Sequence, residues 1–139
     1  SKSPKIQSLN QYIHSEALRE ARLCYDHLAG TLGIRITEAF LKLGYIKLEN
    51  DMFFITELGI DKLIELKIIN CSLSEAKKLQ GIKCYDWSEK DYHIAGPLGK
   101  VIAKAFIELE WIKKSPERRE VKVTEEGKKN LYRYFKIEI

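Results

Sequence analysis

The spacing of apolar residues changes along the first half of the chain from helical to strand-like and back to helical. Apolar side chains first recur every three to four residues, then fall in two short runs rich in Ile, Leu and Phe, and then return to helical spacing. Gly44 is placed to end a helix, and Thr56 to begin one by accepting hydrogen bonds from first-turn amides. The pattern predicts helices over 10–25, 34–43 and 56–66, and strands over 45–48 and 52–55.

A similar pattern runs through the second half. Ser72 or Ser74 can cap a short helix over 75–79 in the segment that connects the halves. Further on, Ser88 resembles the start of a capped helix, and Pro116 suits the tip of a hairpin. The pattern predicts a helix from about 88 to 109, strands over 111–113 and 120–123, and a helix over 124–135.

The halves match because the sequence is internally duplicated. The segment CYDHLAGTLG at residues 24–33 returns as CYD at 84–86 and HIAGPLG at 93–99, with six residues inserted between the two parts. Downstream, apolar positions such as Phe40 and Phe106 also correspond. Self-similarity of this kind indicates a repeat architecture.

The duplication sets the expected architecture. Each copy is too short to bury an adequate core alone, so the halves are expected to pack together as one unit. Helices followed by a hairpin and a final helix that begins Thr-x-x-Gly are the order of a winged-helix unit. We therefore expect an α+β, mainly helical fold of two tandem, degenerate winged-helix-like repeats. The expected divisions are residues 1–69 for a lead-in helix and the first repeat, 70–83 for a linker, and 84–139 for the second repeat.

Composition narrows the class of protein. Of the 139 residues, 45% are hydrophobic and 32% are charged, a balance typical of water-soluble globular domains, and no apolar run approaches the roughly 18 residues of a membrane span. The three cysteines are odd in number and not closely spaced, which disfavours a disulfide framework and favours a reducing compartment. We therefore expect a cytoplasmic protein without a membrane partner. The net charge of +4 permits an anionic partner without requiring one.

The polar residues that recur in both motifs are the best candidates for binding a ligand. Thiolate, imidazole and carboxylate groups that face each other across the repeats could bind a soft or borderline metal such as zinc. Alternatively, neighbouring aromatic rings could line a pocket for a small-molecule effector. A structural interpretation is also open, with the aspartates as helix caps and the cysteines and histidines in the core. The candidate effector-binding residues are Cys24, Tyr25, Asp26, His27, Cys84, Tyr85, Asp86, Trp87 and His93.

Two features argue against a metal or an enzyme. Cys24 and His27 are expected within one helical turn, whereas the inserted residues separate Cys84 from His93, so two equivalent metal sites are not expected and no metal ligand is assigned. No glycine-rich phosphate loop, nucleophile elbow or zinc-protease signature is present. We therefore assign no catalytic residue, expect no enzyme activity, and identify no cofactor.

The second predicted hairpin is the segment best suited to contact DNA. Its basic residues exceed its two glutamates by three charges and could contact phosphates beside a neighbouring domain, although a solvated hairpin tip is the plainer interpretation. The predicted helix at 34–43 and residues 100–109 of the helix predicted from about 88 carry few polar groups. Both are expected to be more than half buried, which makes them poor readers of bases. The candidate DNA-contact residues are Lys113, Lys114, Arg118, Arg119 and Lys122.

The paired motifs at 21–33, 84–89 and 93–96 resemble a subgroup of bacterial helix-turn-helix regulators of the ArsR type. In that subgroup an amino-terminal winged-helix domain precedes a carboxy-terminal region with duplicated segments, so the resemblance implies that the DNA-reading domain lies before residue 1. It further implies that the full-length protein regulates transcription and binds DNA as a homodimer. The expectation of a small-molecule or metal effector rests on the repeated polar residues and not on the resemblance. The Cys-x-Cys motif of arsenic-responsive members is not found here.

Overall fold

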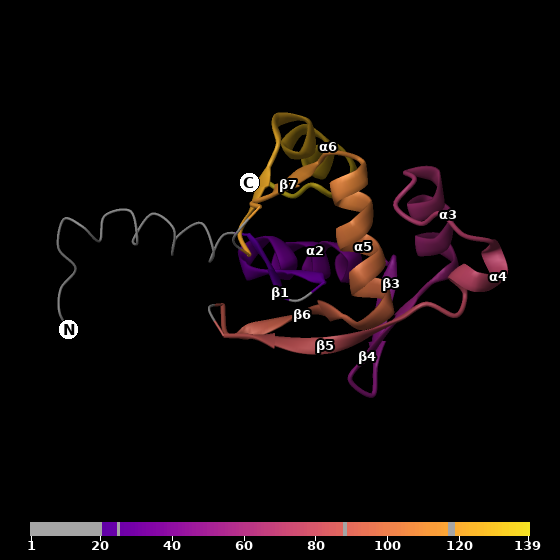
Figure 1. The fold of residues 1–139 in the computed structure, drawn as a ribbon. Coiled ribbons are helices and arrows are strands. Elements are labelled where there is room, and N and C mark those ends of the chain that lie inside the picture. The colour runs from indigo at the N-terminus through magenta and orange to yellow at the C-terminus, as the bar shows by residue number, and fades with distance from the viewer. Residues whose placement is uncertain (1–20, 25, 88, 117–118) are drawn as a thin grey trace, which may run out of the picture.

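The computed structural model describes residues 21–24, 26–87, 89–116 and 119–139 (Figure 1). Within these residues the fold combines helices with antiparallel sheets, which confirms the expected α+β class. The elements of the first half are β1 (Arg22–Cys24), β2 (His27–Ala29), α2 (Gly30–Lys42), β3 (Ile46–Glu49), β4 (Met52–Ile55) and α3 (Glu57–Glu65). After α4 (Leu73–Ala76), the second half comprises β5 (Gln80–Asp86), β6 (Asp91–Ala95), α5 (Gly96–Glu108), β7 (Ile112–Lys114), β8 (Val121–Val123) and α6 (Glu125–Phe135).

The hairpins and helices that follow each motif lie close to their predicted positions, although α2 begins at Gly30 rather than at residue 34, and α4 covers Leu73–Ala76 rather than 75–79. The pairs β3–β4 and β7–β8 are antiparallel hairpins. Thr56 precedes α3 and accepts a hydrogen bond from the Gly59 amide at 3.0 Å, while Thr124 precedes α6 and accepts one from the Gly127 amide at 2.9 Å. Ser72 forms a capping box with Glu75 at the start of α4. These elements were predictable because their signals are local.

The two duplicated motifs themselves do not form the helices predicted for them. Residues 22–24, at the end of the predicted helix over 10–25, form β1, and the rest of that helix lies outside the described residues apart from Ala21. The helix predicted from about 88 begins only at Gly96, because residues 91–95 pair with 82–86 as a hairpin. Short apolar runs fit either a helix or a strand, so periodicity could not decide between them.

The hairpins β1–β2 and β5–β6 each pass directly into a helix through a glycine in the left-handed region. Gly30 has φ +73° and Gly96 has φ +71°, values that other residues adopt only at a cost. Pro97 in the first turn of α5 fixes a helical φ where no amide partner is needed. Both motifs therefore end as a strand, a glycine and a helix start.

The halves are interleaved rather than simply adjacent. Helix α2 packs against β6 of the second half, and α5 packs against β2 of the first half. The sheet order β3-β4-β5-β6 also joins them, with Phe53 opposite Gly81. In Figure 1, α5 runs from the β5–β6 hairpin toward β7 and α6. Phe40 and Phe106, at corresponding positions of α2 and α5, are fully buried in the shared core.

Candidate functional site

The cysteine and histidine of each motif are direct cross-strand partners. Cys24 lies opposite His27 in the β1–β2 hairpin, and Cys84 lies opposite His93 in the β5–β6 hairpin. Opposed residues in an antiparallel pair point to the same face of the sheet with Cβ atoms about 5 Å apart. The six inserted residues therefore lengthen only the outer end of the second hairpin. The expectation that Cys24 and His27 lie within one helical turn is wrong, because both residues lie in strands.

The two hairpins bring their paired residues into one cluster. The Nε2 atoms of His27 and His93 are 3.0 Å apart. Including the sulfur atoms of Cys24 and Cys84, four potential ligand atoms lie within 4.8 Å of one another. Both histidines are buried, and both cysteines are partly buried. Each half of the chain thus supplies one thiol and one imidazole to a single site.

A buried carboxylate lies behind His93. Asp86 is fully buried, and its Oδ2 atom lies 3.2 Å from His93 Nδ1, although the ring is not aligned for a hydrogen bond. The same carboxylate accepts hydrogen bonds from Arg22 Nη2 at 2.9 Å and from the Gly30 amide at 2.6 Å. Asp86 therefore joins the cluster to the first residue of α2. Arg22, also buried, was not identified from the sequence, because a lone arginine in a short strand gives no signal of its partner.

A second carboxylate lies behind His27 in a more exposed position. Asp26 Oδ1 is 3.5 Å from His27 Nδ1, and the Asp26 side chain is 56% exposed. Both histidines therefore turn Nδ1 toward a carboxylate and Nε2 toward each other. Carboxylate–histidine pairs of this kind set the tautomer and orientation of histidines that bind metals.

Burial controls the charge of the cluster. It lowers the pKa of His93 to about 4, an effect to which the neighbouring His27 adds, and it also lowers the pKa of His27. Burial raises the pKa of the Cys84 thiol to about 11, with Cys24 adding to the rise. Near neutral pH both imidazoles are therefore uncharged and Cys84 keeps its proton. Neutral imidazole nitrogens with free electron pairs are able to act as ligands without first losing a proton.

Two aromatic candidates for effector binding, Tyr85 and Trp87, are among the described residues. Trp87 is 64% exposed, and the Arg22 guanidinium stacks over its ring at 4.4 Å. Tyr85 follows Cys84 in β5 and so faces the opposite side of the sheet, where it contacts Tyr92 edge to face at 5.4 Å. Tyr25 lies outside the described residues. The two described aromatics therefore do not enclose the thiols and imidazoles.

Four of the candidate DNA-contact residues lie on the β7–β8 hairpin and are exposed, namely Lys113, Lys114, Arg119 and Lys122. Arg118 lies outside the described residues. Helices α2 and α5 use much of their surface for the core, with buried side chains that include Ile36, Phe40, Ile102 and Phe106. This burial leaves α2 and α5 little polar surface with which to read bases.

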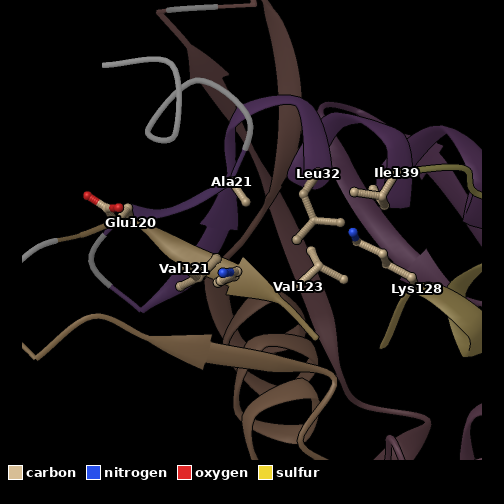
Figure 2. Close-up of a pocket in the computed structure, with 8 residues that line it drawn as sticks. Ala21, Leu32, Glu120, Val121, Val123, Lys128 and Ile139 are labelled. Atoms are coloured by element: carbon tan, nitrogen blue, oxygen red, sulfur yellow. The ribbon is translucent and has the colours of Figure 1, made fainter. Parts of the chain in front are cut away.

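A separate pocket of about 440 Å³ opens beside β8 (Figure 2). Its lining residues are Ala21, Leu32, Glu120, Val121, Lys122, Val123, Lys128 and Ile139. Figure 2 shows Leu32, Val123 and Ile139 grouped near the Lys128 amine, with Glu120 at the far side. None of the candidate effector-binding residues that the structure describes lines this pocket, so it is distinct from the cluster. In the part of the chain that the structure describes, no helix is both long and apolar enough to cross a membrane.

Comparison with known proteins connects the chain to transcription. No protein-family model matches it, and no solved structure shows significant similarity. Over 135 residues it is 31% identical to a Bacillus subtilis protein named "Uncharacterized HTH-type transcriptional regulator YdfF". The alignment covers 97% of this chain and 60% of the relative, so the chain spans about three fifths of the relative's length. This similarity supports a regulatory function in transcription.

Proposed function

We infer that this chain is the effector-sensing region of an ArsR-type transcriptional regulator and that the effector binds at the Cys/His cluster. The observation that carries this proposal is the convergence of Cys24, His27, Cys84 and His93, two from each half, within 4.8 Å. A ligand held by all four residues would connect the halves directly. Catalysis has no support in the described residues, since the cluster lies among buried core residues rather than in an open substrate cleft.

The site is well placed to transmit a signal. His27 lies in the strand that leads into α2, and His93 lies in the strand that leads into α5. Asp86 extends the connection by accepting a hydrogen bond from Gly30, where α2 begins. A ligand that changes the spacing of the two histidines therefore shifts the start of both helices, and small shifts of packed elements are a usual way to propagate binding.

In this proposal DNA is read by a segment other than α2 and α5. The relative extends beyond the region that aligns with this chain, and the apolar burial of α2 and α5 disfavours a reading role for them. Two winged-helix-like units, derived by duplication, then serve for sensing and for homodimer formation in the cytoplasm. The exposed lysines Lys113, Lys114 and Lys122 favour a supporting role at DNA phosphates as the second candidate function.

The proposal is tested in the organism that encodes the chain. The gene is deleted, or replaced by Cys24→Ser, Cys84→Ser or Cys71→Ser variants, and transcripts are measured while metals, oxidants and nutrients are varied. Cys71 is exposed and lies outside the cluster, which makes it the matched control. We expect the deletion to alter a defined set of transcripts, the cluster variants to lose the response of that set to one condition, and Cys71→Ser to respond normally. An unchanged transcript profile in the deletion strain contradicts the proposal.

A further inference from the structure

We propose that the cluster is a tetrahedral site for one divalent transition-metal ion, Zn²⁺ in the first place, bound by the sulfur atoms of Cys24 and Cys84 and the Nε2 atoms of His27 and His93. The identification of the metal as the effector rests on the function proposed above. The existence of the metal site does not, because it follows from the geometry and chemistry of the four side chains.

The spacing of the four atoms fits one metal centre. Given zinc–sulfur bonds near 2.3 Å and zinc–nitrogen bonds near 2.0 Å, tetrahedral ligands are about 3.3–3.8 Å apart. The histidine nitrogens at 3.0 Å are slightly closer than this, and the widest pair in the cluster is no more than 4.8 Å apart. Side-chain movements of about 1 Å therefore bring all four atoms onto one ion without a change of strand register.

The contact between the histidines is itself an argument for a cation. Asp86 and Asp26 each face the Nδ1 atom of one histidine, and a carboxylate there favours the tautomer with the proton on Nδ1. In the metal-free chain the two Nε2 atoms are 3.0 Å apart and form a hydrogen bond when one ring carries its proton on Nε2. When both rings carry the proton on Nδ1, the two Nε2 electron pairs face each other, and a metal ion that accepts both pairs takes the place of the shared proton.

The charge balance also suits a buried site. On binding, the Cys24 and Cys84 thiols each lose one proton to solvent and form a metal–sulfur bond, while the two imidazoles stay neutral and donate electron pairs. Two thiolates cancel the charge of the divalent ion, so the centre carries no net charge. Because an unpaired charge is costly to bury, this neutrality favours a dication over a monocation at these ligands. No oxidant or reductant is needed.

The donor set also determines which ions the site selects. Two sulfur and two nitrogen ligands in a tetrahedral arrangement are typical of Zn²⁺ sites, and they suit Co²⁺ as a spectroscopic substitute. Mg²⁺ and Ca²⁺ prefer six or more oxygen ligands. The buried Asp86 carboxylate at the cluster already accepts hydrogen bonds from Arg22 and Gly30. The site is therefore expected to exclude Mg²⁺ and Ca²⁺.

The site is tested with metal ions and the purified, reduced, metal-free chain. Co²⁺ is titrated in while absorption is recorded, and Zn²⁺ is then added in competition. We expect one Co²⁺ per chain, sulfur-to-cobalt charge-transfer bands, the intense visible bands of a tetrahedral ion, and complete displacement by one equivalent of Zn²⁺. Two protons per chain should be released. Weak pink octahedral Co²⁺ spectra, no saturation at one equivalent, or equal competition by Mg²⁺ overturn the proposal.

Variants assign the ligands. Cys24→Ser, Cys84→Ser, His27→Gln and His93→Gln should each weaken Zn²⁺ binding at least 100-fold and change the Co²⁺ spectrum, while Cys71→Ser should leave both unchanged. Should a ligand variant fail to fold, the wild-type chain decides the matter, because Zn²⁺ that binds only the folded state must raise its melting temperature. A melting temperature that does not move with Zn²⁺ counts against the site.

The two proposals can fail separately. Stoichiometric Zn²⁺ binding by the chain, together with transcripts that ignore Cys24→Ser, leaves the metal site standing as a structural centre and overturns its role as the effector site. A transcript response that depends on Cys24 and Cys84, without Zn²⁺ or Co²⁺ binding by the chain, keeps effector sensing and overturns the metal. The assays share no readout, so neither result depends on the other.

Discussion

Gly33 and Gly99 occupy matching positions, each against the histidine of the other half. A Cβ atom on Gly33 would lie 2.5 Å from the Leu28 carbonyl oxygen and 3.4 Å from the His93 Cβ. A Cβ atom on Gly99 would meet the Ile94 carbonyl oxygen and lie 3.2 Å from the His27 Cβ. The two helices therefore reach the Cys/His cluster only because these positions have no side chain.

Replacing either glycine by alanine is expected to destabilise the fold. Alanine in a helix interior ordinarily gains about 1 kcal/mol over glycine, but backbone oxygens cannot withdraw from the new Cβ without moving a strand. We expect Gly33→Ala and Gly99→Ala each to lower the free energy of unfolding by about 2–4 kcal/mol in urea titrations. Lys100→Ala, at the exposed neighbouring position, should change it by less than about 0.5 kcal/mol. A stabilised Gly33→Ala variant contradicts the close packing.

The buried pair of Arg22 and Asp86 makes a second prediction. Arg22→Met leaves the fully buried Asp86 carboxylate without its cation, which costs about 3–5 kcal/mol of stability. Asp86→Asn added to Arg22→Met should recover part of that loss, because the remaining side chain is neutral. Lys62→Met, which removes an exposed pair with Glu65, should cost less than about 1 kcal/mol. Chemical unfolding of the four proteins measures each difference, and equal losses for Arg22→Met and Lys62→Met contradict the role of the buried pair.

The sequence predicted the elements whose signals lie within a few residues. Thr56 and Thr124 mark helix starts because each hydroxyl accepts a hydrogen bond from the amide three residues further along the chain. The β3–β4 turn was likewise predictable, since Asn50 and Asp51 both tolerate the left-handed backbone that they adopt. Signals of this kind can be recognised in the sequence without knowing which distant segment packs against the element.

The sequence analysis named the cysteines and histidines of the candidate site, but it did not predict that they lie in two hairpins. Cys24 and His27 are opposed across a hairpin, and a three-residue separation alone is equally compatible with one helical turn. What distinguishes the two is the packing of α5 on β2, a contact between segments far apart in the chain. The partnership of Arg22 with Asp86 spans 64 positions, and nothing local in the sequence signals it.

Thiol reactivity provides a third prediction, made for the reduced, metal-free chain. Burial raises the pKa of Cys84 to about 11, so only about a thousandth of this thiol is thiolate at pH 8, and the thiolate is the reactive form. Iodoacetamide should therefore modify the exposed Cys71 well before Cys84, as followed by peptide mass spectrometry. The Cys84 rate should rise about tenfold per pH unit up to its pKa. Equal modification of Cys71 and Cys84 at pH 8 contradicts the raised pKa.

The buried histidines predict that the metal-free chain loses stability in mild acid. The pKa of His93 is lowered from 6.5 to about 4 in the fold, so between these pH values the unfolded chain binds a proton that the folded chain does not. The free energy of unfolding is therefore full above pH 6.5 and falls as pH drops toward 4, by on the order of 3 kcal/mol from His93. The lowered pKa of His27 acts in the same direction. Urea unfolding at several pH values with a chelator present measures this slope, and His93→Gln isolates the contribution of His93 from that of the carboxylates. If wild type and His93→Gln lose stability in parallel between pH 6.5 and 4, the lowered pKa of His93 is wrong.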